Sequence, residues 1–298
     1  MPIRAIILGA AAGGGLPQWN CGCPNCTLAR AGTIPSLTQS SVAVSLDGSS
    51  WALLNASPDL RQQFARAPQL APTDLRTSPL RSVLVTNGDI DHVAGLLTLR
   101  EKQPFDLFAT AEIQAALSGN PMMAAVDAAL VPRRTVSLEM PFELLPGLTA
   151  RLFPVPGKVP LYLEGAEVRT DLEGEQTVGV ELSAGGTRIL YIPGCARVTP
   201  KLAERIEGAE MVFFDGTLWQ DDEMIRAGLG QKTGQRMGHI SMSGPDGSIA
   251  QLGGLGIGTR VFVHMNNTNP VLRPDSAERA EAEGAGWIIA QDGMELTA

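Results

Sequence analysis

Three segments that lie far apart in the sequence carry side chains able to bind a metal ion. Asp91 and His92 are adjacent in the stretch TNGDIDHVAG, and Asp215 and His264 each end an apolar run. Two imidazoles and one carboxylate are the ligand set of non-haem Fe(II) oxygenases, which leave positions open for O2 and substrate. A single buried histidine or a helix-capping aspartate is also common without a metal, so the distant partners decide between these interpretations.

The elements predicted around these residues bring them to one edge of a sheet. Asp91 and His92 follow the apolar run SVLVT. Asp215 ends the run MVFFD, and His264 ends RVFVH. Ligands of α/β sheets collect beyond the carboxyl ends of the strands. The sequence therefore predicts that these four side chains converge on one site.

Apolar runs and turn residues predict an alternation of short strands and helices. The predicted strands are residues 3–8, 41–46, 51–55, 82–86, 105–109, 148–153, 178–182, 187–192, 210–214, 259–263 and 287–291. The predicted helices are residues 58–67, 92–101, 110–118, 200–207, 244–252 and 275–284. Residues 156–177, rich in glycine and acidic residues, predict a long loop. Since no change of composition marks a linker, we expect a single α/β domain over residues 1–298.

Cysteine usage indicates a second metal site. Cys21, Cys23 and Cys26 form the spacing C-x-C-x-x-C, and the fourth cysteine, Cys195, is distant. Three thiols within six residues suit a structural zinc site better than a disulfide framework. A structural zinc ion takes four ligands, so the fourth has to come from elsewhere in the chain or from water.

Charge and hydropathy exclude several classes of partner. The net charge of −8 argues against broad binding to nucleic acid. No apolar run reaches the ~18 residues that a membrane span needs. The N-terminal stretch MPIRAIILGAAAGGG predicts a first strand and a Gly-rich turn rather than a signal peptide, so we expect a cytoplasmic protein. The sequence leaves a homo-oligomer open.

Seven stretches together resemble a known family. They are IILGAAAGGGLPQWNCGCPNC, TNGDIDHVAGLLTLREKQPF, VPGKVPLYLE, YIPGCARVTP, FFDGTLWQDDEMIRAG, TGQRMGHISM and VFVHMNNTNPVL. They are similar to the family of coenzyme PQQ synthesis protein B, in the metallo-β-lactamase superfamily, and the resemblance covers essentially the whole chain. It implies a metallo-β-lactamase-like αββα sandwich, in which two mixed β-sheets face each other, helices lie outside and the site lies at one edge.

The resemblance also implies that one of two metal sites is depleted. Hydrolases of the superfamily carry histidines at two positions of the loop T-H-x-H-x-D-H, where this chain has Asn87 and Asp89. Lys158 and Cys195 stand where another histidine and a bridging aspartate are usual. The second site keeps its ligands, Asp91, His92 and His264. Hydrolysis between two metal ions is therefore disfavoured.

Further roles are expected for polar residues of the matching stretches. Asp215 is a candidate fourth ligand, or an acceptor that orients a histidine. His239 is a candidate proton donor or carboxylate binder, against a packed or capping histidine. Arg236, Lys158 and Arg197 are candidate anchors for acidic substrate groups, against solvated side chains.

The resemblance also suggests a fourth partner for the cysteines. Related phosphodiesterase-like proteins complete a similar site with a histidine three places after the motif histidine, and that position is Asn267 here. Asn267, a water or a nearby carboxylate would complete a Zn(II) site with Cys21, Cys23 and Cys26. We expect this site to hold the N-terminal loop beside the strand that carries His264.

The function implied by the resemblance is biosynthesis of pyrroloquinoline quinone (PQQ). The expected reaction is Fe(II)- and O2-dependent hydroxylation of the tyrosine ring in a cross-linked Glu-Tyr dipeptide, a small-molecule PQQ precursor. Two alternatives remain open. The first is a non-catalytic carrier involved in transport of PQQ or its precursor. The second is a metal-dependent hydrolase of a phosphodiester or peptide bond.

Overall fold

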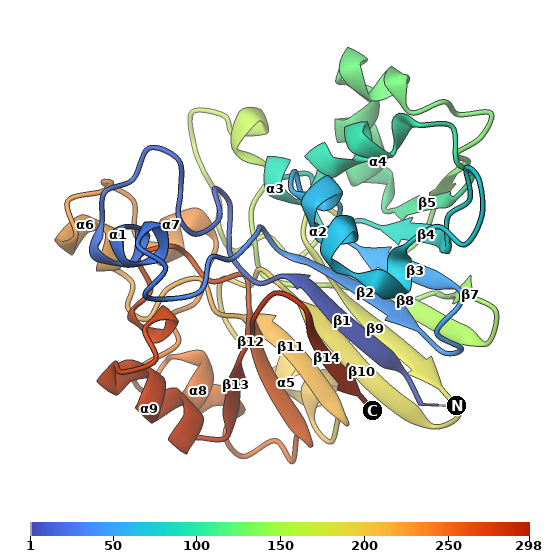
Figure 1. The fold of residues 1–298 in the computed structure, drawn as a ribbon. Coiled ribbons are helices and arrows are strands. Elements are labelled where there is room, and N and C mark those ends of the chain that lie inside the picture. Colours follow the sequence, from blue (N-terminus) through green and yellow to red (C-terminus); the bar gives the residue numbers. More distant parts are fainter. Residues whose placement is uncertain (1) are drawn as a thin grey trace.

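The computed structural model describes residues 2–298 as two seven-stranded mixed sheets packed face to face (Figure 1). The first sheet has the order β14-β1-β2-β3-β4-β5-β6, and the second has the order β13-β12-β11-β10-β9-β8-β7. The strands of the first sheet are β1 (Arg4–Gly9), β2 (Ser41–Ser45), β3 (Trp51–Leu54), β4 (Leu80–Leu84), β5 (Asp106–Ala109), β6 (Arg133–Thr135) and β14 (Met294–Thr297). Those of the second are β7 (Pro141–Leu145), β8 (Leu148–Pro154), β9 (Val178–Ala184), β10 (Thr187–Ile192), β11 (Met211–Asp215), β12 (Thr259–Val263) and β13 (Trp287–Ile289).

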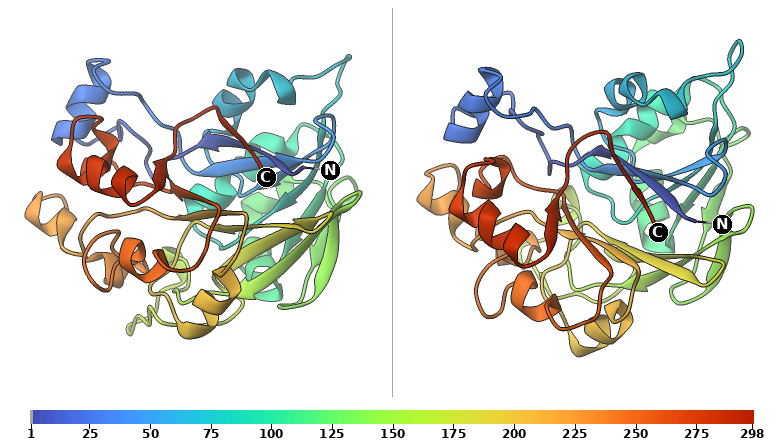
Figure 2. Two further views of the ribbon diagram at one scale, coloured as in Figure 1. Left: turned by 90° about the horizontal axis from the view of Figure 1, so that it is seen from below. Right: turned by 60° about the horizontal axis from the view of Figure 1, so that its bottom comes forward.

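The helices are short and lie outside the two sheets (Figure 2). They are α1 (Pro24–Arg30), α2 (Leu60–Arg66), α3 (Ile90–Val93), α4 (Ala111–Ser118), α5 (Pro200–Ile206), α6 (Glu223–Arg226), α7 (Gly234–Met237), α8 (Ser248–Leu252) and α9 (Ala277–Gly284). The 3₁₀ turns are Pro68–Leu70, Ala94–Arg100, Pro121–Ala125, Leu161–Leu163 and Pro270–Leu272. In Figure 1, α2 and α4 flank the first sheet, and α5, α8 and α9 flank the second. The architecture confirms the expected αββα sandwich.

Each sheet has a parallel half and an antiparallel half. Strands β3 to β6 run parallel in the first sheet, and β10 to β13 run parallel in the second. The sequences LRSVL of β4 and MVFFD of β11 are almost wholly buried, as expected of parallel strands covered on both faces. Because parallel strands end at the same edge, the segments after β4, β11 and β12 meet there, and the register Asp215↔Val263 aligns the last two.

The two ends of the chain are joined through the first sheet. β14 pairs antiparallel with β1, and the Ile3 amide donates to the Ala298 carbonyl at 2.8 Å. Buried apolar side chains from both sheets form one continuous cluster, which includes Trp51, Tyr191 and Phe262. Within residues 2–298, no helix is long and apolar enough to cross a membrane.

Every predicted strand is present, but three strands were not predicted. β6, β7 and β14 contain several exposed or half-buried positions and lack a continuous apolar run, so hydropathy alone did not identify them. The predicted helix over 92–101 is a short α-helix followed by the 3₁₀ turn Ala94–Arg100. The predicted loop over 156–177 contains the 3₁₀ turn Leu161–Leu163.

Candidate metal-binding active site

Asp91, His92 and His264 meet between the two sheets, as predicted. Asp91 Oδ2 lies 3.0 Å from His264 Nε2 and 3.9 Å from His92 Nε2. One potential ligand atom from each residue lies within 4.8 Å of the others. His264 follows β12 and adopts the left-handed conformation, with φ of 58°, which is uncommon for residues other than glycine and is found at functional sites.

Asn87 fixes the tautomer of His92. Its Oδ1 accepts from the Asp89 amide at 2.9 Å, which identifies this atom as the oxygen, and lies 2.6 Å from His92 Nδ1. Nδ1 therefore carries the proton, and Nε2 keeps a lone pair. Within the described residues 2–298, this buried Nε2 has no hydrogen-bond partner. A buried acceptor left without a donor, 3.9 Å from a carboxylate oxygen, fits a metal ligand.

The hydroxyl of Thr217 connects the remaining polar residues. It lies 2.6 Å from Asp215 Oδ1 and 2.9 Å from His264 Nδ1. Since a hydroxyl has one hydrogen, it donates to the carboxylate and accepts from His264 Nδ1–H, which directs His264 Nε2 toward Asp91. This indirect support of a ligand is typical of metal sites.

Asp215 is fully engaged by donors from the protein. Oδ1 accepts from the amide and hydroxyl of Thr217 at 3.0 and 2.6 Å. Oδ2 accepts from the Cys195 amide at 2.9 Å and from His239 Nδ1 at 2.7 Å. The His239 ring stacks on His264, with centroids 5.2 Å apart. The geometry favours Asp215 as the group that orients His239, while Asp215, His239 and His264 also lie close enough to share an ion.

Burial and charge set the protonation of the three central residues. Burial opposes ionisation of Asp91, but its electrostatic interaction with the His92 ring and its hydrogen bond with His264 hold the pKa of its carboxyl below the usual value. Burial lowers the pKa of His92, so its ring is neutral at pH 7. Burial also lowers the pKa of His264, yet hydrogen bonding to Asp91 outweighs it and raises this pKa. A metal ion at His264 Nε2 would take the place of the proton that Asp91 stabilises there.

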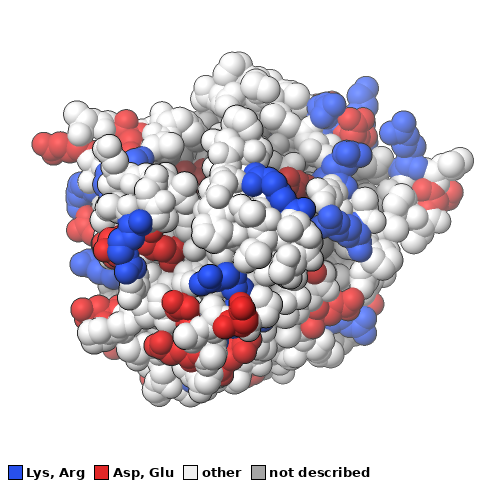
Figure 3. Space-filling model, turned by 60° about the vertical axis from the view of Figure 1, so that its left-hand side comes forward, with Lys and Arg blue, Asp and Glu red and all other residues white. Residues whose placement is uncertain are grey.

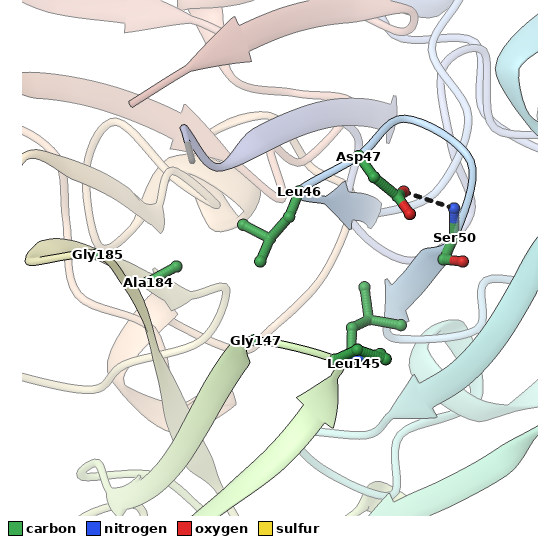
Figure 4. A pocket seen from close by; sticks show the side chains of 8 residues that line it. Leu46, Asp47, Ser50, Leu145, Gly147, Ala184 and Gly185 are labelled. Atoms are coloured by element: carbon green, nitrogen blue, oxygen red, sulfur yellow. Dashed lines mark hydrogen bonds between the residues drawn. The ribbon is translucent and has the colours of Figure 1, made fainter.

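The central residues open into a cavity of about 340 Å³. Its lining includes Asn87, Asp89, Lys158 and Lys232. A second cavity of about 350 Å³ lies at turns between strands, among Leu46, Leu145 and Ala184 (Figure 4). The one acidic group there, Asp47, is used up by hydrogen bonds from serines of its own turn, so this cavity offers no comparable chemistry.

Lys158, Asp89 and Cys195 stand at positions where superfamily hydrolases carry metal ligands, and all three make other contacts here. Lys158 Nζ pairs with Glu164 at 3.1 Å, and Asp89 Oδ1 accepts from the Leu161 amide at 3.4 Å. Cys195 is buried, and its Sγ donates to the Arg197 carbonyl at 3.1 Å. Burial raises the pKa of the Cys195 thiol, which disfavours the thiolate that a metal requires.

The predicted anchors differ in position. Lys158 lines the cavity, and Arg236 reaches the same acidic partner, Glu164, at 2.9 Å. The predicted anchor Arg197 instead lies in an exposed pair with Glu173 at 3.9 Å, and it is not among the residues that line the cavity. Lys232, which the sequence did not single out, lines it.

The three clustered cysteines are buried and free of disulfides. Their sulfur atoms lie within 4.8 Å of one another. Burial and then the neighbouring thiols raise the pKa of Cys23 to about 11, so three thiolates there require a cation. Asn267 Nδ2 faces Cys21, Cys23 and Cys26 at 3.2, 3.5 and 3.3 Å. Ligation by Asn267 would need its amide turned so that Oδ1 faces the sulfurs.

The cysteine cluster is tied to the segment that follows His264. Asn25 in α1 donates to the carbonyls of Asn267 and Asn269 at 3.0 and 2.9 Å. The Met265 amide donates to the Ala10 carbonyl at 2.9 Å. The N-terminal loop is thus hydrogen-bonded to the chain on the far side of His264 from β12.

Comparisons with known proteins show the family and the fold. The beta-lactamase superfamily domain matches residues 50–265. Coenzyme PQQ synthesis protein B of Ruegeria pomeroyi is 60% identical, and that of Methylorubrum extorquens is 58% identical, each over 99% of both chains. A crystal structure of Zn(2+)-bound PqqB from Methylobacterium extorquens has a TM-score of 0.97 and 58% identity, covering 98% of this chain and 99% of that one. A diphosphatase from the PhnP family, 19% identical with a TM-score of 0.72, covers 100% of this chain and 98% of that chain and shows the fold alone.

Removing the Thr217 hydroxyl should weaken binding of a metal ion at the active site without unfolding the protein. We expect Thr217→Val to lower Fe(II) affinity about 10- to 100-fold, because the His264 tautomer is no longer fixed. Thr217→Ser keeps the hydroxyl and should bind Fe(II) like the wild type. Anaerobic competition with a chromophoric chelator measures the three affinities, and equal values would contradict the role given to Thr217.

Cys26→Ser should lose the structural metal. We expect the bound zinc to fall by one ion per chain and the melting temperature to fall by at least about 5 °C, because the site links two distant segments. Cys195→Ser, at the cysteine outside the cluster, should keep the zinc. Elemental analysis and calorimetry give both readouts, and retention of zinc by Cys26→Ser would show that the cluster is not its site.

Proposed function

We propose a reaction for this chain on one premise: it belongs to the family of coenzyme PQQ synthesis protein B, within the beta-lactamase superfamily. Its role is therefore in PQQ biosynthesis. The reaction we propose is O2-dependent hydroxylation of the tyrosine ring of a cross-linked Glu-Tyr dipeptide. The observation that supports it is the set formed by Asp91, His92 and His264, which brings two imidazoles and one carboxylate together.

The donor set fits one Fe(II) ion. Two imidazole nitrogens and one carboxylate oxygen lie within 4.8 Å of one another, and the His92 acceptor is otherwise unsatisfied within residues 2–298. When bound, such an ion supplies one-electron chemistry toward O2 while keeping positions open. Two-metal hydrolysis needs a second ion about 3.5–4 Å away. The side chains at the second position, Asn87, Lys158 and Cys195, are already engaged elsewhere.

The overall reaction balances without an external reductant. A phenol and O2 give an ortho-quinone and water: one oxygen atom replaces a ring hydrogen, and the other leaves as water. The two electrons and two protons still required come from the resulting catechol. A group that accepts and returns protons is therefore needed next to the ring.

His239 is placed to move those protons. Its Nδ1 is held by Asp215 at 2.7 Å, its ring lies against His264, and it lines the cavity. With Nδ1 committed to the carboxylate, Nε2 is the nitrogen that takes the phenol proton, and Asp215 stabilises the charged ring that results. Lys158 and Lys232 bring positive charge to the same cavity and bind substrate carboxylates.

Oxygen transfer to the dipeptide tests this proposal. Protein loaded anaerobically with Fe(II) is mixed with the cross-linked Glu-Tyr dipeptide and exposed to ¹⁸O2, and the small molecule is analysed by mass spectrometry. We expect one labelled oxygen atom in the product of the wild type. We expect none with His264→Ala, which loses a ligand, and a rate at least about 100-fold lower with His239→Gln, which cannot move the proton.

The alternatives give different outcomes in the same experiment. A carrier would bind the dipeptide and return it unchanged, in the wild type as in His264→Ala. A hydrolase would form product with zinc and without O2. Either result would overturn the hydroxylation proposal.

A further inference from the structure

A short segment of the long loop borders the active-site cavity. It includes the 3₁₀ turn Leu161–Leu163, and Leu161 lines the cavity. The Tyr162 hydroxyl donates to the Gly88 carbonyl at 2.8 Å, and the Leu161 amide donates to Asp89. The segment is therefore attached to the loop that carries Asp91.

Glu164 ends this segment and forms ion pairs with two cationic side chains from different parts of the chain. Its Oε1 lies 3.1 Å from Lys158 Nζ, and its Oε2 lies 2.9 Å from Arg236 Nη2. The side chain of Glu164 is 8% exposed and that of Lys158 is 12% exposed. The hydrogen bond from Arg236, with further help from Lys158, lowers the pKa of the Glu164 carboxyl to about 2, so it is ionised at neutral pH.

This arrangement is a carboxylate-binding site that the chain itself fills. A guanidinium and an ammonium on two segments converge on one nearly buried carboxylate, which is the geometry used to bind a carboxylate ligand. Because Lys158 also lines the cavity, the site lies at the cavity rim. While Glu164 occupies it, two positive charges are balanced by one negative charge.

The segment that carries Glu164 has the features of a part that can move away. Leu161, Tyr162 and Leu163 are 59%, 47% and 50% exposed, and residues 165–167 are exposed. A segment with so little buried apolar surface opens at a small fraction of the free energy of global unfolding. If a ligand carboxylate replaces that of Glu164, the two cations still have an ion-pair partner. The net electrostatic cost of the exchange is therefore small.

Lys232 supplies a positive charge that is not neutralised in this way. It is exposed, lines the cavity and has no ion-pair partner within 4.0 Å in the part of the chain that the structure describes. The face that carries α1, α6 and α7 in Figure 1 shows a broad uncharged area with interspersed basic and acidic side chains (Figure 3). An isolated, exposed ammonium in the cavity lining attracts a ligand that carries several carboxylates.

We propose that Glu164 is an internal competitor for the Lys158–Arg236 pair, which a carboxylate of the ligand displaces, and that this exchange selects ligands with several carboxylates. The choice of ligand class rests on the proposed function, because PQQ and its dipeptide precursor carry several carboxylates. Neutral molecules cannot take the place of Glu164, so for them the segment keeps its ion pairs.

Equilibrium binding of PQQ tests the exchange without any oxygen chemistry. Zinc-loaded protein is titrated with PQQ, a tricarboxylate, by calorimetry at two salt concentrations. We expect Glu164→Gln to bind PQQ at least about tenfold more tightly than the wild type and with a steeper salt dependence, because two uncompensated cations remain. We expect Lys158→Met and Arg236→Met each to bind it at least about tenfold more weakly.

Glu167→Gln is the matched control, since it removes one charge from an exposed position of the same loop and should leave the Kd unchanged. If Glu164→Gln binds like the wild type, or as weakly as Lys158→Met, then Glu164 only shapes the loop and the proposal is overturned. Absence of PQQ binding by all the proteins also overturns it. If the Kd values follow the expected order but no ¹⁸O is transferred, only the hydroxylation proposal is rejected. The two proposals can therefore fail separately.

Discussion

The contact between Asp91 and His264 is the constraint on which the rest of the structure depends. Asp91 follows a strand of the first sheet and His264 follows a strand of the second, and their polar atoms are 3.0 Å apart in a partly buried place. Holding a carboxylate and two imidazoles there requires that every other polar atom nearby has a partner. Asn87 Oδ1 is the partner of His92 Nδ1. Thr217 Oγ1 is the partner of His264 Nδ1, and Asp215 is the partner of His239 Nδ1. The left-handed backbone of His264 persists because the flanking segments fix it on both sides.

Several positions that carry metal ligands in hydrolases of the superfamily have side chains with other contacts in this chain. Asn87, where a ligand histidine is usual in the superfamily, now orients a ligand of the remaining site. Lys158, at another former ligand position, pairs with Glu164 at the rim of the cavity. The cysteine cluster, through Asn25 and α1, holds the chain just after His264. On one fold, side chains at positions where superfamily hydrolases carry metal ligands can therefore make quite different contacts.

Much of this organisation could be predicted from the sequence, and the missing parts have physical reasons. The buried parallel strands are continuous apolar runs, so their carboxyl ends, and with them Asp91, Asp215 and His264, were located correctly. The edge strands β6, β7 and β14 are stabilised by pairing rather than by burial, and their composition gave no signal. The roles of Asn87, Thr217 and Glu164 depend on which hydrogen bonds form between distant segments. Only the position of Thr217, two residues after Asp215, offered a local hint. Arg197 was a candidate anchor for acidic substrate groups, but its side chain pairs with Glu173 and does not line the cavity.

The claim that one metal ion lies between the two sheets is tested most directly by anomalous diffraction. Crystals of Fe(II)-loaded protein, grown without O2, are measured on both sides of the iron and zinc absorption edges. The account predicts one iron peak among Asp91, His92 and His264, and a zinc peak among the clustered cysteines. A second metal peak within about 4 Å of the iron, bound by Asp89 or Asp215, would contradict it, because a two-metal centre for hydrolysis would then be complete.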